Sequence, residues 1–325
     1  MLAITIVGQG DTSALEVVEA PEPVIAPDEV LIEVVAAGVN RTDTLQRRGA
    51  SLTATGAPRF PGLEVSGVVA ATGEAVRRWR VGDRVCALLT DGGYASRVAV
   101  HESHVLAVPD GIDLVEAAAL PEALATVWSN LTAPVGLRAG EALLVHGAGS
   151  GIGTIAIQVA KLLGARVLVT AGSQAKLDGC RELGADEGID YRSEDFVSGV
   201  HERTGGRGVD MILDIVGASY LARNLAALAP DGRIAVVGLQ SGAAAELDLR
   251  DVLRKRAVIT GSLLRPRSAE DKARILAAVA ERVLPAVADG RVRPVVDSVV
   301  PFAHAMQAHA RLEASDHFGK ILLVP

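Results

Sequence analysis

The chain has few cysteines, few aromatic residues and no strongly basic segment. Only two of its 325 residues, Cys86 and Cys180, are cysteines, so neither a disulfide framework nor a four-cysteine structural zinc site can form. We therefore expect a reducing, cytoplasmic location. Lys and Arg total 32 against 39 Asp and Glu, and no Lys/Arg-rich run could follow a phosphate backbone. Nucleic acid is not an expected partner.

Signals for export and for membrane insertion are also missing. Residues 1–7 lack the basic start of a signal peptide, and Gln9 and Asp11 interrupt any apolar core. The longest uncharged stretch, residues 142–160, contains a histidine and four glycines, which makes it a poor membrane span. We expect that stretch to form a strand, a loop and a helix, and we expect no membrane partner.

Length and patterning favour two folded domains. The chain exceeds the ~100–200 residues typical of one domain, and its 49% hydrophobic and 22% charged residues are typical of globular proteins. Residues 30–106 alternate short β-rich runs with turns, which predicts an antiparallel β module. Strand and helix signals alternate after Gly140, and β signals return at 295–300 and 320–324, so we expect the C-terminus to rejoin the first domain. The predicted domains are residues 1–122 with 266–325, and residues 123–265.

The second region has the pattern of a doubly wound parallel sheet. Its six candidate strands are residues 142–146, 166–170, 187–190, 209–214, 233–237 and 257–261. Strands joined by helices of this length pair in parallel and carry helices on both faces, as dinucleotide-binding domains do. Gly164 and Gly184 are expected to end helices, and Ser268 to begin one.

A glycine-rich loop follows the first of these strands and leads into a helix. Glycine lets the backbone approach a pyrophosphate closely, and the N–H groups at the helix start bind anionic oxygens. The spacing differs from G-x-G-x-x-G, because Ile152 stands where the third glycine would be. A turn that only packs the helix on the sheet is the alternative. The loop residues expected to bind a dinucleotide are Gly147, Gly149, Ser150, Gly151, Ile152 and Gly153.

The residues after the second and third strands favour NADPH over NADH. Sites for NAD usually carry an acidic residue at the end of the second strand, where it binds the adenosine 2′-hydroxyl. This sequence has Gly172 and Ser173 there, and Lys176 follows within reach of a 2′-phosphate. Tyr191 and Arg192, after the third strand, could add a hydroxyl and a guanidinium. A solvated surface lysine is the alternative for Lys176.

Motifs spread over nearly the whole chain carry a family resemblance. They are residues 37–43 with 46–49, 61–67, 82–85, 92–95, 120–123 with Thr126, and 147–153. With these motifs the chain resembles the zinc-free, zeta-crystallin-like quinone oxidoreductases of the medium-chain dehydrogenase/reductase superfamily. The resemblance implies an α/β protein with a GroES-like β-rich catalytic domain and a Rossmann cofactor domain. It also implies an enzyme that reduces quinones with NADPH, without zinc or flavin, as a homodimer.

The resemblance implies that no catalytic zinc is bound. The zinc-dependent alcohol dehydrogenase relatives carry a cysteine and a histidine at the positions of Asn40 and Leu63. Asparagine and leucine cannot supply the thiolate and imidazole that a catalytic zinc needs. Without a Lewis acid, the acceptor should take a hydride or electrons readily by itself, as quinones and activated enones do.

The same resemblance suggests roles for individual residues. Asn40 is expected beside the nicotinamide and the acceptor, where its amide could donate to a developing quinol oxygen. Asp43 and Gln46 line the same helix start, and Thr126 is expected to contact the nicotinamide carboxamide. A helix cap or a buried core residue is the alternative for each. The residues expected to border the cofactor are Gly238, Leu239, Gln240, Leu263, Leu264, Arg265, Phe318, Gly319 and Lys320.

Two other functions remain open at this stage. Many family members place tyrosines after the Asn-x-x-Asp stretch to shape the acceptor pocket, but Leu45, Ala50 and Ser51 stand in that region here. A zinc-free enoyl or 2-alkenal reductase would share the fold and cofactor site, although no tyrosine is obviously placed as its proton donor. An NADPH-binding sensor or structural protein with little turnover is the alternative of another class. The apolar strand 257–261 is expected to pair with its copy in the homodimer.

Overall fold

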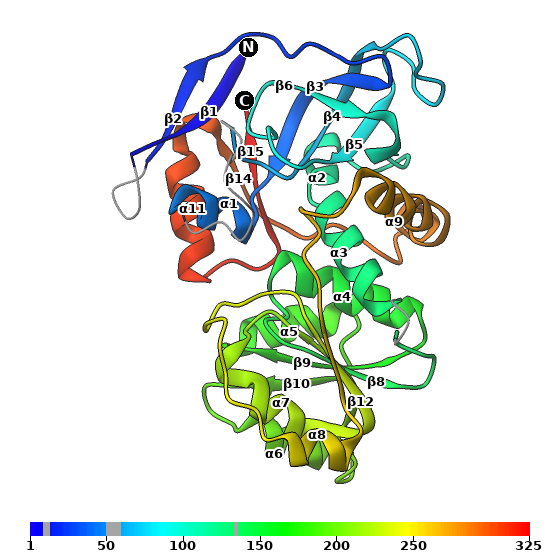
Figure 1. Ribbon diagram of the computed structural model, residues 1–325, viewed down its shortest axis with the longest axis vertical. Helices are drawn as coiled ribbons and strands as arrows, with labels where there is room; N and C mark the ends of the chain where they lie inside the picture. The colour runs from blue at the N-terminus through cyan, green and yellow to red at the C-terminus, as the bar shows by residue number, and fades with distance from the viewer. Residues whose placement is uncertain (9–13, 50–59, 133–135) are drawn as a thin grey trace. The chain divides into compact units, whose positions relative to one another are not determined.

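Two compact units make up the chain. The computed structural model describes residues 1–8, 14–49, 60–132 and 136–325 (Figure 1). Unit 1 comprises Met1–Ala125, Leu264–Gly290 and Pro294–Pro325, and unit 2 comprises Thr126–Leu263 and Arg291–Arg293. The α/β fold class is confirmed, with a β-rich GroES-like unit and a Rossmann-like unit. In the part of the chain that the structure describes, no helix is long and apolar enough to cross a membrane. Ala50 and Ser51 lie outside the described residues.

Unit 1 is built on a seven-stranded sheet whose strand order is β14-β15-β3-β4-β5-β7, with β6 pairing β3. All its pairs are antiparallel except β14 with β15, so the predicted antiparallel module is confirmed. The hydrophobic core of this unit includes Ile32, Val65, Tyr94 and Ile321. Its strands are β3 (Glu29–Gly38), β4 (Glu64–Thr72), β5 (Arg84–Leu88), β6 (Arg97–His101), β7 (Val105–Ala107), β14 (Val296–Pro301) and β15 (Lys320–Val324).

The remaining elements of unit 1 cover and flank this sheet. A separate antiparallel pair is formed by β1 (Leu2–Val7) and β2 (Ala14–Glu19). The helices are α1 (Arg41–Arg47), α2 (Leu114–Ala117), α9 (Ala269–Arg282), α10 (Leu284–Ala288) and α11 (Ala305–Ala314), with short 3₁₀ turns at Glu102–His104 and Phe302–His304. Helix α3 (Pro121–Leu131) begins in unit 1 and continues into unit 2.

The last strand of the chain pairs with β3, far away in sequence. In this antiparallel pair Leu322 is opposite Gly38 and Leu323 is opposite Ala37. The backbone N–H of Val39 donates to the carbonyl of Ile321 at 2.9 Å, which continues the pairing by one residue. This register brings the first residue of β15, Lys320, next to the residue that precedes α1, Asn40.

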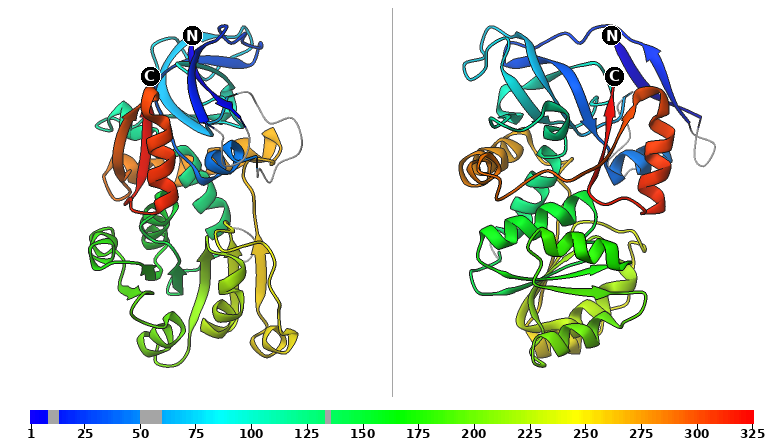
Figure 2. Two further views of the ribbon diagram at one scale, coloured as in Figure 1. Left: turned by 90° about the vertical axis from the view of Figure 1, so that its left-hand side faces the viewer. Right: turned by 180° about the vertical axis from the view of Figure 1, so that it is seen from behind.

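Unit 2 is a six-stranded parallel sheet in the order β10-β9-β8-β11-β12-β13, which confirms the predicted doubly wound sheet. Helices α4 and α5 cover one face, and α6, α7 and α8 cover the other (Figures 1 and 2). The strands are β8 (Ala142–Val145), β9 (Arg166–Ala171), β10 (Glu187–Asp190), β11 (Val209–Asp214), β12 (Leu228–Val236) and β13 (Val258–Gly261). The helices are α4 (Gly151–Leu162), α5 (Gln174–Glu182), α6 (Phe196–Arg203), α7 (Leu221–Ala227) and α8 (Leu249–Lys255), with a 3₁₀ turn at Ala218–Tyr220.

One strand differs from its predicted start. We expected a strand at 233–237, but β12 begins at Leu228. The sequence Pro230-Asp231-Gly232 is a turn signal, and Asp231 has a φ of 63°. The strand nevertheless continues past this turn signal. Its pairing with β11 accommodates the extra residues by a shift of register between Val209 and Met211.

The predicted helix ends are confirmed. Gly164 and Gly184 follow α4 and α5 with φ angles of 79° and 103°, the left-handed geometry that favours glycine after a helix. Ser268 precedes α9, and its hydroxyl accepts the Asp271 N–H at 3.1 Å. These local signals mark the ends of α4 and α5 and the start of α9.

Candidate functional site

In unit 2 the expected cofactor residues gather at the carboxyl edge of the parallel sheet. The glycine loop follows β8, Gly172 follows β9, Tyr191 follows β10, and Gly238 follows β12. Strand β8 lies in the middle of the sheet, between β9 and β11. From β8 the chain adds β9 and β10 on one side, and it then crosses back to add β11, β12 and β13 on the other side. The carboxyl edge at this point of reversal is where open α/β sheets bind ligands.

The glycine loop is folded tightly against the start of α4. Gly147 has a φ of 62°, and a Cβ on Gly153 would lie only 2.5 Å from the Ala148 Cα. Both positions therefore require glycine. The Ser150 hydroxyl accepts the Gly153 N–H at 3.0 Å, so Ser150 is the N-cap of α4. The cap leaves the first two N–H groups of α4, those of Gly151 and Ile152, at the positive end of the helix dipole.

The end of β9 is surrounded by groups that suit a phosphate. A Cβ on Gly172 would lie 2.7 Å from the Tyr191 hydroxyl and 3.1 Å from the Arg192 Nε, so both groups are held against this glycine. The Ser173 hydroxyl caps α5 by accepting the Lys176 N–H at 3.4 Å, which puts Lys176 in the first turn. The first turn of α5 contains no acidic residue. A hydroxyl and a guanidinium group thus lie against the end of this strand, and Lys176 lies in the first turn of the helix that follows it.

The segment after β12 packs on the end of β11 through Ile215. A Cβ on Gly238 would lie 2.7 Å from the Ile215 carbonyl oxygen, and the Gln240 N–H donates to the same oxygen at 3.3 Å. A Cβ on Gly147 would also strike the Ile215 side chain. Ile215 therefore separates the glycine loop from the Gly238–Leu239–Gln240 segment. No sequence pattern indicated this role for Ile215, because an apolar residue after an apolar strand has no distinguishing pattern.

Thr126 is a buried residue of α3 and is linked to the end of β13. Its carbonyl oxygen accepts the Asn130 Nδ2 at 2.8 Å, and the Asn130 Oδ1 accepts the Ser262 hydroxyl at 3.0 Å. Leu263, the next residue, is exposed. Asn130 connects the expected nicotinamide contact to Ser262, a role that the sequence did not indicate.

The other expected cofactor residues belong to unit 1. Leu264 and Arg265 are buried there, and the Arg265 Nε donates to the Thr90 carbonyl at 2.9 Å. Phe318 donates its N–H to Asp297 at 3.0 Å, and Gly319 has a φ of 96°. Arg265 and the 318–319 turn are each held by contacts within unit 1.

Unit 1 brings Asn40 and Lys320 together with Glu64. The Lys320 ammonium donates to the Asn40 Oδ1 at 2.6 Å and forms an ion pair with Glu64. The Asn40 Nδ2 donates to the Glu64 Oε1 at 2.9 Å. The exposed fractions of Asn40, Glu64 and Lys320 are 9%, 0% and 5%, so the three polar side chains satisfy one another in a nearly dry environment.

Asp43 holds the backbone around Asn40. Its carboxylate accepts the Asn40 N–H at 2.7 Å, the Gly62 N–H at 3.2 Å and the Tyr94 hydroxyl at 3.1 Å. Burial raises the pKa of Asp43 to about 6, although these hydrogen bonds and Lys320 act in the opposite direction. Asp43 is fully buried and binds backbone N–H groups, and Gln46 is buried in the same helix.

Tyr94 and His309 extend this buried network. The Tyr94 hydroxyl lies 3.1 Å from the His309 Nε2, and burial raises the pKa of Tyr94. Burial lowers the pKa of His309 to about 3, so the imidazole is neutral near pH 7. Because Tyr94 donates its only proton to the Asp43 carboxylate, the hydrogen bond between Tyr94 and His309 requires the neutral ring to donate through Nε2.

The sequence reasoning missed Glu64, Tyr94 and His309 as members of this cluster. Glu64 and Lys320 are each the first residue of an otherwise largely apolar strand, β4 or β15. Two charges of opposite sign at the starts of buried strands are a signal for a buried pair. The sequence could not show that both would meet Asn40, because this depends on strand pairing.

The positions of the zinc ligands in zinc-dependent relatives do not suit a metal here. The Asn40 Oδ1 accepts from a lysine ammonium, whose positive charge would repel a divalent cation, and Leu63 is apolar and buried. Within residues 1–8, 14–49, 60–132 and 136–325, no group of three or more His, Cys, Asp or Glu side chains could hold a metal ion. The donor set at Asn40 therefore does not fit zinc.

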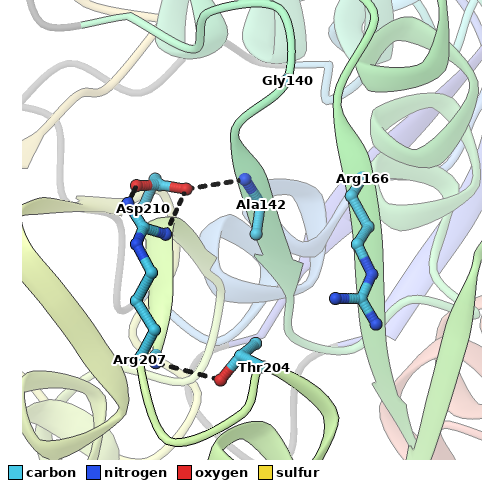
Figure 3. A pocket seen from close by; sticks show the side chains of 7 residues that line it. Gly140, Ala142, Arg166, Thr204, Arg207 and Asp210 are labelled. Carbon is cyan, nitrogen blue, oxygen red and sulfur yellow. Dashed lines mark hydrogen bonds and ion pairs between the residues drawn. The ribbon is translucent and has the colours of Figure 1, made fainter.

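A small pocket of about 170 Å³ lies at the opposite edge of the unit 2 sheet (Figure 3). Arg207 and Asp210 in its wall form an ion pair at 2.5 Å, and Asp210 also accepts the Ala142 N–H at 2.8 Å. The pocket lies at the amino ends of β8, β9 and β11, whereas the glycine loop follows the carboxyl end of β8. It is not part of the candidate site. Its lining residues are Gly140, Ala142, Arg166, Thr204, Arg207, Gly208 and Asp210.

Two protein-family models match the chain. The alcohol dehydrogenase GroES-like domain matches residues 26–110, and the zinc-binding dehydrogenase matches residues 151–281, a range that contains neither Asn40 nor Leu63. The quinone oxidoreductase of Sus scrofa is 32% identical over 304 residues, which cover 93% of this chain and 91% of that protein.

Solved structures match the whole chain. The quinone oxidoreductase of Escherichia coli complexed with NADPH has a TM-score of 0.89 at 29% identity, with 100% of both chains covered. An NAD-dependent alcohol dehydrogenase has a TM-score of 0.88 at 32% identity, also with 100% of both chains covered. The similar structures thus include proteins named for each of the two nicotinamide cofactors.

Proposed function

Since the chain belongs to the quinone oxidoreductases of the medium-chain dehydrogenase/reductase superfamily, and is an oxidoreductase, we propose that it reduces quinones with NADPH and without zinc or flavin. The observation that carries this proposal is the pairing of Asn40 with the Lys320 ammonium. A site that holds an ammonium instead of a metal has no Lewis acid to stabilise an alkoxide. The acceptor must then be one that is reduced readily by itself, and a quinone is such an acceptor.

The carboxyl edge of the unit 2 sheet supports dinucleotide binding. The Gly147–Gly153 loop would receive the pyrophosphate on the N–H groups at the start of α4. The groups around Gly172 favour NADPH over NADH, because a 2′-phosphate carries negative charge and no acidic side chain stands in the first turn of α5. When bound, NADPH supplies the hydride for the reaction.

In the overall reaction a quinone, NADPH and one proton give a hydroquinone and NADP⁺, so the two electrons and the hydrogen atoms balance. The protein would contribute orientation and a hydrogen bond from Asn40 to the acceptor oxygen that becomes negative. Thr126 would contact the nicotinamide carboxamide. We propose Asp43 and Gln46 as supports of the helix start that carries Asn40.

The tyrosines argue against the alkenal reductase alternative. Tyr94 is fully buried and bonded to Asp43 and His309. Tyr191 follows β10 and its hydroxyl lies against Gly172 at the end of β9, and Tyr220 packs against Phe196 and His146. In unit 1, which contains Asn40, the hydroxyl of the only tyrosine is thus already used by Asp43 and His309 and is not available as a proton donor to a substrate carbon.

The edge strand of unit 2 supports the proposal of a homodimer. Strand β13 ends the sheet order, and Val258 and Ile259 on it are 38% and 39% exposed. An exposed apolar edge strand is a ready site for pairing with a second copy. The two cysteines are free and buried, which suits the reducing cytoplasm that we propose as the location.

The test is to follow oxidation of NADPH, and separately of NADH, with a panel of ortho- and para-quinones and 2-alkenals, with and without a chelator. We expect chelator-insensitive quinone reduction that prefers NADPH. Reduction of alkenals alone would replace the proposal by an enoyl reductase. Tight NADPH binding without turnover of any acceptor would favour the sensor alternative.

A further inference from the structure

We propose that Glu64 and Lys320 are positioning residues: they fix the direction in which the Asn40 amide points, and they affect acceptor reduction only through Asn40. This inference rests on the proposed function, because it assumes that Asn40 donates to the acceptor. It gives Lys320 a different role from the cofactor contact that the family resemblance implies.

The two partners of Asn40 permit a single orientation of its amide. A lysine ammonium can only donate a hydrogen bond, so the group at 2.6 Å from Lys320 must be the Oδ1. A carboxylate can only accept, so the group at 2.9 Å from Glu64 must be the Nδ2. Rotation of the amide by 180° would place NH₂ against the ammonium and oxygen against the carboxylate. Both contacts would then be repulsive.

This orientation leaves one donor of Asn40 weakly engaged. One Nδ2 hydrogen is bonded to Glu64, and the other faces the Gly38 carbonyl at 3.4 Å, which is beyond the usual 2.7–3.2 Å for N–H···O bonds. The second hydrogen can therefore be redirected to a ligand oxygen at little cost. The Oδ1, in contrast, is already used by Lys320, so Asn40 is held as a donor and not as an acceptor.

The positions of Glu64 and Lys320 are fixed by backbone contacts. The second carboxylate oxygen of Glu64 accepts the Glu122 N–H at 2.9 Å, at the start of α3. Gly38 leaves the space for this carboxylate, since a Cβ there would lie 2.7 Å from the Glu64 carboxyl carbon. Lys320 is held by the pairing of β15 with β3. The ion pair is shielded from solvent, so salt would screen it little.

The first experiment is a double-mutant cycle on Asn40 and Lys320. We expect Asn40→Ala to lower kcat ~100-fold, the usual effect of removing one donor to a developing negative charge. Lys320→Met should lower kcat at least ~10-fold, with the Kd for NADPH changed by less than ~2-fold, because a misdirected amide affects the acceptor rather than the cofactor. In the Asn40→Ala background, Lys320→Met should change kcat by less than ~2-fold.

Two variants serve as rescue and control. Lys320→Arg keeps a donor cation and should recover most of the loss in kcat. Lys272 is another nearly buried lysine of unit 1, and its ammonium contacts the Thr90 hydroxyl instead of Asn40. Lys272→Met should leave kcat within ~2-fold of wild type, which separates the loss of Asn40 orientation from the general loss of a buried lysine.

A second variant covers the case in which Lys320→Met does not fold. Glu64→Gln preserves shape, but its NH₂ group must face either the Asn40 Nδ2 or the Glu122 N–H, and each of these is a donor. The same loss of kcat without loss of NADPH affinity is expected. An effect of Lys320→Met or Glu64→Gln that persists in the Asn40→Ala background would overturn the inference, as would a rise in the Kd for NADPH of ~10-fold or more.

An activity-independent measurement separates this inference from the proposed function. In protein labelled with ¹⁵N-asparagine, the Asn40 side-chain amide signals are identified by their loss in Asn40→Asp. We expect slow hydrogen exchange of these signals in wild type and faster exchange in Lys320→Met. Unchanged exchange would overturn the positioning role. Absence of quinone turnover in wild type, with exchange behaving as expected, would overturn only the proposed function.

Discussion

Asn40 and Lys320 are 280 positions apart in the sequence, and the ammonium of one lies 2.6 Å from the amide oxygen of the other. The contact is a consequence of backbone pairing, because β15 pairs with β3 and its first residue is opposite the residue that precedes α1. Glu64 completes the cluster from the start of β4. The Asn40 amide before α1, the Glu64 carboxylate at the start of β4 and the Lys320 ammonium at the start of β15 thus meet in one buried cluster.

The space for Glu64 can be tested at Gly38. We expect Gly38→Ala to destabilise the protein by ~1–3 kcal/mol and to lower kcat, because the added methyl group would overlap the Glu64 carboxylate and displace it from Asn40. Denaturant unfolding measures the first effect, and quinone reduction at saturating NADPH measures the second. Wild-type stability together with wild-type kcat would contradict the packing described here.

The groups near Gly172 that we propose to bind the 2′-phosphate predict the cofactor preference. We expect Lys176→Ala and Arg192→Ala each to raise the KM for NADPH ~10-fold or more, and to leave the KM for NADH nearly unchanged, because only NADPH carries the 2′-phosphate. Lys161→Ala is the matched control, since the Lys161 ammonium is paired with Asp186 at 2.9 Å. Equal losses for both cofactors in the Lys176 or Arg192 variant would assign these residues a structural role.

The raised pKa of Asp43 predicts a pH dependence of stability. Burial raises this pKa from 3.8 to about 6, so between these pH values the folded state binds more protons than the unfolded state. The contribution of Asp43 to the free energy of unfolding therefore falls by roughly 3 kcal/mol as the pH rises from about 4 to 7. The measurement is the difference in unfolding free energy between wild type and Asp43→Asn across this range.

Comparison with Asp43→Asn is necessary because His309 acts in the opposite direction. Its pKa is lowered from 6.5 to about 3, so the unfolded state binds more protons and stability falls as the pH falls through this range. The variant retains His309, and subtraction removes most of that contribution. A difference that does not change with pH would show that Asp43 has no raised pKa.

The exposed edge of β13 predicts how the proposed homodimer can be disrupted. We expect Ile259→Lys to shift the protein from dimer to monomer, because a charge on an apolar edge strand disfavours pairing with a copy. Light scattering coupled to size exclusion measures the change. Val24→Lys, at a residue of unit 1 that is 93% exposed, is the control and should not change the mass. A dimeric Ile259→Lys protein would place the interface elsewhere.

Features encoded by short stretches of sequence were predictable. The alternation of apolar strands with helices predicted the doubly wound sheet, and Gly164, Gly184 and Ser268 predicted helix ends. The glycine loop was recognisable because strand, loop and helix start are contiguous in the chain. β12 was predicted too short, since a local turn signal at Pro230–Gly232 lies inside a strand that tertiary pairing continues.

The sequence by itself determined most of the secondary structure, the glycine-rich loop and the residue types available for chemistry, because these depend on local periodicity, capping and backbone freedom. Only the tertiary structure decided that Asn40 meets Glu64 and Lys320, that Tyr94 is buried against Asp43, and that Ile215 lies between two loops. Strand register and side-chain packing fix these contacts. Register and packing both join residues that are distant in sequence. No local sequence pattern indicates which distant residue will be the partner.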